Sequence, residues 1–335
     1  MARGKGVALV TGAAGFTGWH MVKLLLEEGY EIIATDCRKS NNDPVYKLTR
    51  FIEIDLTNPA DVFDEGFLKE LAEAQFVFHI AGIFDHAASL SKLFEVNVLG
   101  TRNLLDAIRR AHAGEAQKYP RVIIWGASGI FGDFSHISLP ATEAMPPRTD
   151  NPYFLSKLYE ELEALRFWQR DRLPVTVLRP SAVYGSHSVY GMALSITTLL
   201  KSRMAFVVGN GKNKGVLVHV RDVVRAAEFL ARNDGAVGEV YHVTDDNPYS
   251  VEEITRSLAQ SCGAIFVPIK IPTWIALRLA KLIGVHRELI KVATVNTWLS
   301  NEKLKKLGFS FQYPDSKIGL AETAAWYKRM HKSKR

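Results

Sequence analysis

Cysteine is scarce in this sequence. Its 335 residues include two cysteines, Cys37 and Cys262, which lie far apart and have no partners at metal-ligand spacing. Disulfide-stabilised secreted domains and cysteine-based zinc sites carry several cysteines at short intervals. We therefore expect neither a disulfide framework nor a metal site.

Long hydrophobic runs are also missing. No apolar run approaches the roughly 18 residues that a membrane-spanning helix needs. The first apolar run, after Lys5 and Gly6, is too short and wrongly flanked for a signal peptide. The pattern at 274–283 is amphipathic, and we expect it to pack over a substrate pocket rather than on a lipid surface. These features predict a cytoplasmic protein without stable membrane insertion.

Nothing in the composition is extreme. Hydrophobic residues make up 47% and charged residues 23%, which excludes a disordered chain, a collagen and a coiled coil. The formal net charge is +7, but acids are interspersed with the cations, so no stripe for nucleic acid emerges. The basic tail at 331–335 is expected to be a solvated terminus.

Short apolar runs alternate with amphipathic helical patterns along the chain. Helices are expected at about 18–28, 90–111, 153–170 and 222–233. Strands are expected at 7–10, 31–35, 51–54, 76–80, 121–125, 175–178 and 216–220. Such alternation is typical of a parallel sheet covered by helices on both faces. The predicted fold class is α/β, a Rossmann-type doubly wound parallel sheet with a smaller, mainly helical C-terminal substrate lobe.

The rhythm loosens after Pro180, which suggests a second lobe. A turn-rich break at 210–215 interrupts the alternation, and helical patterns dominate from Asn247 onwards. We predict a nucleotide-binding domain of residues 1–180 plus 215–243. The substrate-binding lobe is then formed by residues 181–214 plus 244–335.

A glycine-rich turn joins the first strand to the first helix. Gly12, Gly15 and Gly18 have the spacing G-x-x-G-x-x-G, and Phe16 and Thr17 lie between the last two. Glycines at such a turn allow a tight bend, a close approach of backbone to a pyrophosphate, and packing of helix on strand. The free N–H groups and the dipole of the helix N-terminus favour the anion. We predict that these five residues bind a dinucleotide.

Acidic residues follow the second and third strands. Asp36 ends the second strand, where a carboxylate accepts hydrogen bonds from both ribose hydroxyls of adenosine and repels a 2′-phosphate. This favours NAD, while Arg38 leaves NADP as the alternative because it would accommodate that phosphate. Asp55 and Leu56 end the third strand at the same edge, either contacting adenine or capping the helix that follows.

Tyr153 and Lys157 form the pattern Y-x-x-x-K near the start of a helix signalled by Asn151 and Pro152. The i, i+4 spacing places phenol and ammonium on one helix face, and a cation beside a phenol favours the phenolate. Ser128 follows the fifth strand at the carboxyl edge of the sheet, where its hydroxyl would hydrogen-bond a substrate oxygen. We predict these three residues to be catalytic.

Taken together, these motifs resemble the extended short-chain dehydrogenase/reductase family along nearly the whole chain. The resemblance rests on the following residues: Gly12, Gly15, Gly18, Asp36, Asp55-Leu56, His79-Ile80-Ala81-Gly82, Asn97-Val98-Leu99-Gly100-Thr101, Asn103, Ser128, Tyr153, Lys157, Leu178-Arg179-Pro180, Val183-Tyr184-Gly185, His219-Val220-Arg221-Asp222-Val223, Leu307-Gly308-Phe309, Gly319 and Trp326. By this resemblance, Tyr153 is the general acid/base. Lys157 binds the nicotinamide ribose and tunes Tyr153, and Ser128 orients the reacting oxygen.

The resemblance also implies further cofactor contacts. Ala81 and Gly82 would line the adenosine and ribose path, and Asn97 matches a structural and proton-relay asparagine. Pro180 and Val183 would pack near the nicotinamide carboxamide. Members of the family often form homodimers through two helices, here about 90–111 and 153–170.

Three positions depart from the family pattern. Counting back from Phe131-Gly132 puts the catalytic hydroxyl position at Ala127, whereas counting along the strand puts it at Ser128, which we prefer. Nucleotide-sugar enzymes usually carry asparagine and arginine where this chain has Ala182 and Gly215.

These last two departures favour an oxidoreductase for an alcohol or ketone of an apolar small molecule, similar to 3β-hydroxysteroid dehydrogenases and dihydroflavonol reductases. The alternatives are a nucleotide-sugar epimerase or dehydratase with bound NAD, and a non-catalytic dinucleotide-binding scaffold.

Overall fold

The computed structural model describes residues 5–38, 43–85, 88–132, 134, 138–280, 290 and 295–333. The chain divides into two compact units. Unit 1 comprises Met1–Gly132, Pro147–Arg179 and Val224–Tyr241. Unit 2 comprises Asp133–Pro146, Pro180–Val223 and His242–Arg335. Lys334 and Arg335 of the basic tail, and residues 281–283 of the amphipathic segment, lie outside the described residues.

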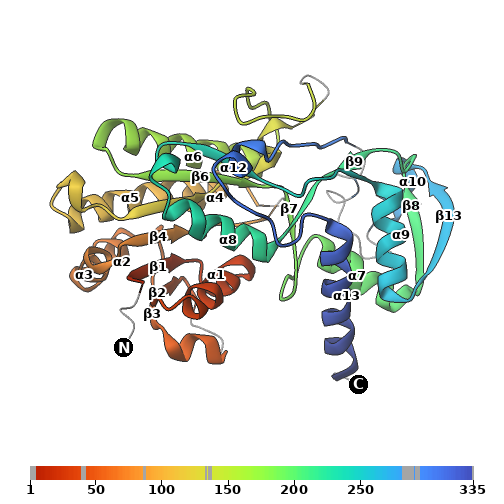
Figure 1. Ribbon diagram of the computed structural model, residues 1–335, viewed down its shortest axis with the longest axis horizontal. Helices are drawn as coiled ribbons and strands as arrows, with labels where there is room; N and C mark the ends of the chain where they lie inside the picture. The colour runs from red at the N-terminus through yellow and green to blue at the C-terminus, as the bar shows by residue number, and fades with distance from the viewer. Residues whose placement is uncertain are drawn as a thin grey trace. The chain divides into compact units, whose positions relative to one another are not determined.

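A seven-stranded sheet forms the centre of unit 1 (Figure 1). Its strands run in the order β11-β6-β5-β4-β1-β2-β3, and every pairing from β3 to β6 is parallel. The strands are β1 (Val7–Thr11), β2 (Glu31–Asp36), β3 (Arg50–Glu53), β4 (Phe76–His79), β5 (Arg121–Trp125), β6 (Val175–Pro180) and β11 (Val240–Val243). The predicted doubly wound Rossmann-type sheet is confirmed.

Helices cover the sheet. The helical segments are α1 (Phe16–Glu27), η1 (Pro44–Leu48), α2 (Pro59–Val62), α3 (Glu65–Glu73), α4 (Leu90–Leu93), η2 (Phe94–Leu99), α5 (Gly100–Ala111), η3 (Ala116–Lys118), η4 (Ser128–Phe131), α6 (Pro152–Asp171), α8 (Val220–Ala231) and η6 (Asp234–Ala236). Helices α3, α5 and α6 pack in sequence on one face of the sheet. On the other face, Tyr30 at the start of β2 donates a hydrogen bond to Glu228 of α8 (2.8 Å).

The core of unit 1 is aliphatic because both faces of the sheet are covered, as expected for a parallel sheet. Leu9 of β1, Val77 of β4 and Ile124 of β5 are fully buried and pack against Leu105 of α5 and Phe167 of α6. This packing holds the carboxyl ends of the strands in one row, where loops carry the predicted site residues.

The described residues of unit 2 form three two-stranded sheets and several helices. Its elements are β7 (Ala182–Tyr184), α7 (Met192–Ser202), β8 (Met204–Val208), β9 (Lys214–Gly215), β10 (Leu217–His219), β12 (Tyr249–Ser250), α9 (Val251–Cys262), β13 (Ile265–Ile271), α10 (Thr273–Leu279), α12 (Glu302–Lys306) and α13 (Ser316–Ser333). Helices α7, α9 and α13 share a core that includes Ile196, Leu258 and Leu320. A capping box at Ser250 and Glu253 begins α9, and Gly263 in the left-handed region ends it.

The structure differs from the sequence expectations in two places. The seventh strand of the sheet is β11, whereas the pattern at 216–220 forms β10, which pairs with β7. The predicted helix 90–111 is interrupted by a π-helical segment, η2.

The described residues contain neither a membrane-spanning helix nor a cluster of metal-binding side chains. None of their helices is long and apolar enough to cross a membrane. They also contain no group of three or more His, Cys, Asp or Glu side chains that could hold a metal ion.

Candidate active site

The glycine-rich turn brings backbone very close to backbone. Gly12 has a φ of +65°, and a Cβ there would lie 2.7 Å from the backbone of Ala81 in the loop after β4. A Cβ on Gly18 would overlap the carbonyl oxygen of Gly12. Gly15 is the N-cap of α1, and in the described chain no side chain caps this helix end and no acid lies in its first turn. The first turn of α1 therefore offers its N–H groups to an anion.

Asp36 lies at the carboxyl end of β2 beside this turn. Its side chain is nearly buried and accepts hydrogen bonds from the backbone N–H groups of Ala14 (3.0 Å) and Arg38 (3.2 Å). These bonds fix the carboxylate at the mouth of the turn, as a ribose-binding acid requires. Arg38 itself is exposed.

Asp55 and Leu56 follow β3 as predicted, but their local bonds are those of a turn. The Asp55 carboxylate accepts hydrogen bonds from the backbone (2.8 Å) and hydroxyl (2.7 Å) of Thr57. Leu56 is buried, and its carbonyl accepts a hydrogen bond from Asn103 (2.8 Å). Asp55 thus orders the turn before α2, whose N-cap is Asn58 rather than Asp55.

The π-helical segment η2 positions Asn97. Such segments re-aim side chains within a helix and are frequent at functional sites. Asn97 is fully buried, accepts a hydrogen bond from the N–H of Ile83 (2.8 Å), and donates one to Ser156 (2.9 Å). Ser156 in turn donates to the carbonyl of Tyr153 (2.7 Å). Asn97 thus connects the loop after β4 with the first turn of α6.

Tyr153 lies in the first turn of α6. The Asn151 side chain caps this helix by accepting from the N–H groups of Tyr153 (3.0 Å) and Phe154 (3.3 Å), and Pro152 occupies the first position. The Tyr153 ring makes an edge contact with Phe84, at 4.9 Å between centroids. The phenol is therefore held by both backbone and ring packing.

Ser128 begins η4 directly after β5. A Cβ on the next residue, Gly129, would overlap the ring of Phe154, so η4 lies against the start of α6. Ser128 is half-buried, whereas Ala127 is buried. Among the described residues the Ser128 hydroxyl has no hydrogen-bond partner, which leaves it available to a ligand.

Lys157 lies one turn after Tyr153 and is almost fully buried. A Cβ on Gly82 would lie 3.8 Å from its Nζ atom and 3.1 Å from Asn97 Oδ1, so Gly82, Asn97 and Lys157 come together. Glu160 binds this lysine, and it was not among the predicted site residues. Glu160 Oε2 lies 2.5 Å from Lys157 Nζ, and the i, i+3 spacing of the two residues was the available signal.

A buried chain of hydrogen bonds connects Thr11, His79, Thr101 and Asn97. His79 contacts Thr11 through Nδ1 (2.8 Å) and Thr101 through Nε2 (2.7 Å). The Thr101 hydroxyl donates to the carbonyl of Asn97 (2.6 Å), so it accepts from His79. Burial, assisted by the charge of Lys157, lowers the pKa of His79 to about 3. The imidazole is neutral, with its proton on Nε2.

Pro180 and Val183 belong to unit 2, in contrast to the other predicted site residues. Val183 lies in β7, where it is paired with Val218 of β10. The remaining predicted residues lie at the carboxyl ends of β1, β2, β3, β4 and β5, at the start of α1, on η2 and on α6.

Comparison with known proteins decides the family. The family model described as "NAD dependent epimerase/dehydratase family" matches residues 8–244. The chain belongs to this family. The predicted family and the predicted class, an NAD-dependent enzyme of the extended short-chain type, are thereby confirmed.

Several relatives in this family span most of the chain. Sterol-4-alpha-carboxylate 3-dehydrogenase, decarboxylating, of Mus musculus is 26% identical over 320 residues, covering 89% of this chain and 84% of the mouse protein. The dTDP-D-glucose 4,6-dehydratase of Homo sapiens is 27% identical over 343 residues, covering 96% and 88%. The structure of DesIV, a dTDP-glucose 4,6-dehydratase from Streptomyces venezuelae with NAD and TYD bound, matches with a TM-score of 0.76, 26% identity, and coverage of 96% and 97%.

The residues present fit the family's cofactor. Only glycine fits at positions 12 and 18 without displacing backbone, and the uncapped α1 N-terminus suits a pyrophosphate. The Asp36 carboxylate lies beside that turn, where adenosine ribose would be held. NAD, the predicted cofactor, is therefore consistent with both the family and the geometry.

Proposed function

We propose that this protein is an NAD-dependent dehydrogenase that interconverts a secondary alcohol and a ketone on an apolar small molecule. The observation that supports this most is the meeting of Asn97 and Lys157 at Gly82, with Tyr153 one turn before Lys157 on α6, within a chain of the NAD dependent epimerase/dehydratase family.

Residues of unit 1 would hold the cofactor. Gly12, Gly15, Phe16, Thr17 and Gly18 would surround the pyrophosphate. Asp36 would accept hydrogen bonds from the adenosine ribose. Ala81 and Gly82 would line the path towards Lys157, which would donate to the nicotinamide ribose. NAD supplies the hydride acceptor when it is bound.

The chain's own groups would handle the proton. In alcohol oxidation, the phenolate of Tyr153 takes the hydroxyl proton while the C–H bond of the carbinol breaks. The Lys157 ammonium favours that phenolate by its charge. The Ser128 hydroxyl donates a hydrogen bond to the substrate oxygen and so fixes its orientation. In ketone reduction the same groups act in reverse, and Tyr153 returns the proton.

Residues of unit 2 support the proposed substrate class. Ala182 is exposed on β7 and Gly215 lies on β9, so neither position provides the amide or the guanidinium expected for a nucleotide diphosphate. The exposed side chain of Val189 adds apolar surface in the same unit. The likeness to a sterol-4-alpha-carboxylate 3-dehydrogenase agrees with a polycyclic or steroid-like alcohol.

A substrate panel tests this proposal. Purified protein with NAD should form NADH on a panel of hydroxysteroids and sterols. Tyr153→Phe should lower kcat by about a hundredfold or more, since general acid/base catalysis contributes about 10²–10⁴-fold. Absence of turnover on this panel, together with activity on a UDP- or dTDP-sugar, would refute the substrate class.

The second candidate is a nucleotide-sugar dehydratase or epimerase. It is favoured by the 27% identity to human dTDP-D-glucose 4,6-dehydratase across 96% of this chain. Lys212 and Lys214 also favour it, because they lie close in sequence to Gly215, where nucleotide-sugar enzymes usually carry an arginine. NAD that remains bound through purification, and thermal stabilisation by UDP or dTDP, would support this candidate over the first.

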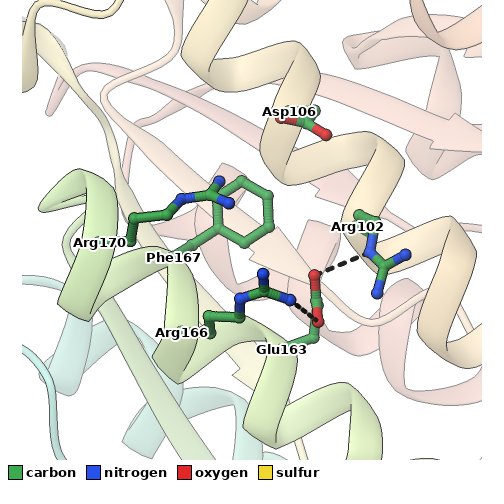
Figure 2. A pocket seen from close by; sticks show the side chains of 6 residues that line it. All are labelled: Arg102, Asp106, Glu163, Arg166, Phe167 and Arg170. Atoms are coloured by element: carbon green, nitrogen blue, oxygen red, sulfur yellow. Dashed lines mark hydrogen bonds and ion pairs between the residues drawn. The ribbon is translucent and has the colours of Figure 1, made fainter.

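We also propose that two chains associate through helices α5 and α6. Apolar side chains are exposed on α6, at Tyr159 (47%) and Leu162 (50%), and at Leu99 (44%), the last residue of η2 directly before α5. A hollow of about 230 Å³ lies between α5 and α6. Its lining consists of charged side chains and Phe167 of α6, which are drawn in Figure 2. Glu163 lies between Arg102 and Arg166 there, so the surface carries both charge signs and suits association with its own copy.

A further inference from the structure

Glu160 is a fully buried carboxylate for which the proposed mechanism has no role. Its side chain is 0% exposed, and Lys157 Nζ lies 2.5 Å from its Oε2 atom. Apart from this ion pair, neither carboxylate oxygen has a hydrogen-bond partner among the described residues. Burying an ionised carboxylate with so few hydrogen bonds costs folding free energy. The Lys157–Glu160 pair is therefore poorly explained as an interaction that only stabilises the fold.

The neighbouring acid shows what a structural pair looks like in this helix. Glu161 binds Arg179 of β6 through two hydrogen bonds, one of them from Nε to Oε2 at 2.9 Å. That fork satisfies both carboxylate oxygens and joins α6 to the sheet. Glu160, by contrast, meets a lysine that the family assigns to the cofactor.

Few other charges act on the Lys157–Glu160 pair. From β4, His79 faces Lys157 and is neutral. From α6, Glu161 contributes negative charge, which Arg179 of β6 balances. Burial raises the pKa of Glu160 to about 7, with Lys157 opposing this shift and Glu161 adding to it. The carboxyl therefore exchanges its proton in the neutral range.

We propose that Glu160 is a positioning residue that holds the Lys157 ammonium and sets, by its own protonation, the net charge that Lys157 presents to Tyr153 and to the cofactor ribose. The inference rests on the role proposed for Lys157. When Glu160 is ionised, the pair is neutral and Lys157 favours the phenolate of Tyr153 less. When Glu160 is protonated, the full ammonium charge acts.

The first test needs neither substrate nor cofactor. In protein labelled with ¹³C at the glutamate carboxyls, the resonance that disappears in Glu160→Gln should titrate near neutral pH in the unmodified protein. Lys157→Met should move this titration to higher pH, because the ammonium lowers the pKa of the carboxyl. Should Glu160→Gln fold poorly, Glu160→Asp removes the same glutamate resonance and identifies it equally well.

The second test uses NAD. In the unmodified protein, the Kd for NAD should rise on the order of threefold as Glu160 ionises, because the pair then offers less positive charge to an anionic ligand. Glu160→Gln should bind NAD with little pH dependence across this range. The matched control is Glu73→Gln on helix α3, which breaks an exposed ion pair with Arg50 of β3 (2.9 Å). This variant should behave like the unmodified protein.

The third test uses turnover. In alcohol oxidation, Glu160→Gln should move the midpoint of the Tyr153 limb of the kcat/KM profile to lower pH by about one unit, because the ammonium loses its counter-charge. A merely structural glutamate would change stability without this shift. If no alcohol is turned over, the proposed substrate class fails, while the first two tests still decide the role of Glu160.

Two results would overturn the inference. One is a Glu160 resonance that titrates in the ordinary glutamate range and is unaffected by Lys157→Met. The other is a Glu160→Gln variant whose NAD affinity keeps the pH dependence of the unmodified protein.

Discussion

His79 shows how one buried side chain organises the predicted site. It links Thr11, at the end of the strand that leads into the glycine-rich turn, to Thr101 and through it to Asn97. The chain of bonds requires a neutral imidazole that donates from one nitrogen and accepts at the other. Protonation adds a second donor that no longer suits the Thr11 contact and places a cation near Lys157.

The burial of His79 predicts an acid-sensitive fold. Its pKa is lowered to about 3 in the folded protein, compared with about 6.5 in an unfolded chain. The folded state therefore binds this proton less readily, so its contribution to stability is present above pH 6.5 and is lost as the pH falls towards 3. The free energy of unfolding should lose about 1.4 kcal/mol per pH unit from this group in that window.

Denaturant unfolding at several pH values measures this slope. In His79→Gln, which does not titrate, the slope between pH 6.5 and the onset of acid unfolding should be shallower by that amount. An unchanged slope would show that His79 titrates equally in both states. The control is His112→Gln, which alters another buried histidine, at the C-cap of helix α5.

At the scale of elements, the packing of α1 against its own turn decides the phosphate site. A Cβ on Gly18 would overlap Gly12 O and lie 2.8 Å from the Cα of Ala13, and both obstacles are backbone. Gly18→Ala should therefore displace the turn and weaken NAD binding by about tenfold or more. Isothermal titration calorimetry measures the loss.

A matched glycine tests whether this effect is local. Gly100 begins α5, and a Cβ there would meet its nearest neighbour, Leu56 Cβ, at 3.4 Å, which is an ordinary contact. Gly100→Ala should keep NAD affinity and raise stability by about 0.5–1 kcal/mol, because alanine favours the helix. Equal losses of NAD affinity in both variants would contradict the interpretation of the turn.

At the scale of the whole molecule, the exposed apolar residues of α6 and at the end of η2, directly before α5, predict self-association. Leu162→Glu places a charge in the proposed interface and should convert the dimer to a monomer, since a buried unpaired charge is costly. Leu48→Glu, at an equally apolar side chain that is 72% exposed on η1, should leave the dimer intact. Light scattering after size-exclusion chromatography distinguishes the two outcomes, and a monomeric unmodified protein would refute the interface.

Local rules predicted much of unit 1. Short apolar runs became β1 to β6 within a few residues, and the Asn151-Pro152 signal marked the start of α6. The glycine spacing and Asp36 indicated a dinucleotide turn, and the structure brings them together. These features were readable because strand period, capping and glycine conformation depend on neighbours in sequence.

Contacts between segments distant in sequence could not be predicted from these local rules. The pattern at 216–220 is strand-like, yet only tertiary packing pairs β10 with β7 and leaves β11 to complete the central sheet. The helical pattern at 90–111 gives no sign of the π-helical η2, which forms where Asn97 binds Ile83 and Ser156. Pairing partners and helix defects of this kind are decided by tertiary contacts.

The sequence by itself determined the family, the sheet, and which side chains carry the proposed chemistry, because these follow from motifs and periodicity. Only the tertiary structure decided their electrostatic setting. Glu160 and Glu161 are adjacent identical residues, yet one meets Lys157 and the other Arg179. Burial removes water from both, so the protonation of each depends on the cation and hydrogen bonds that the fold places beside it.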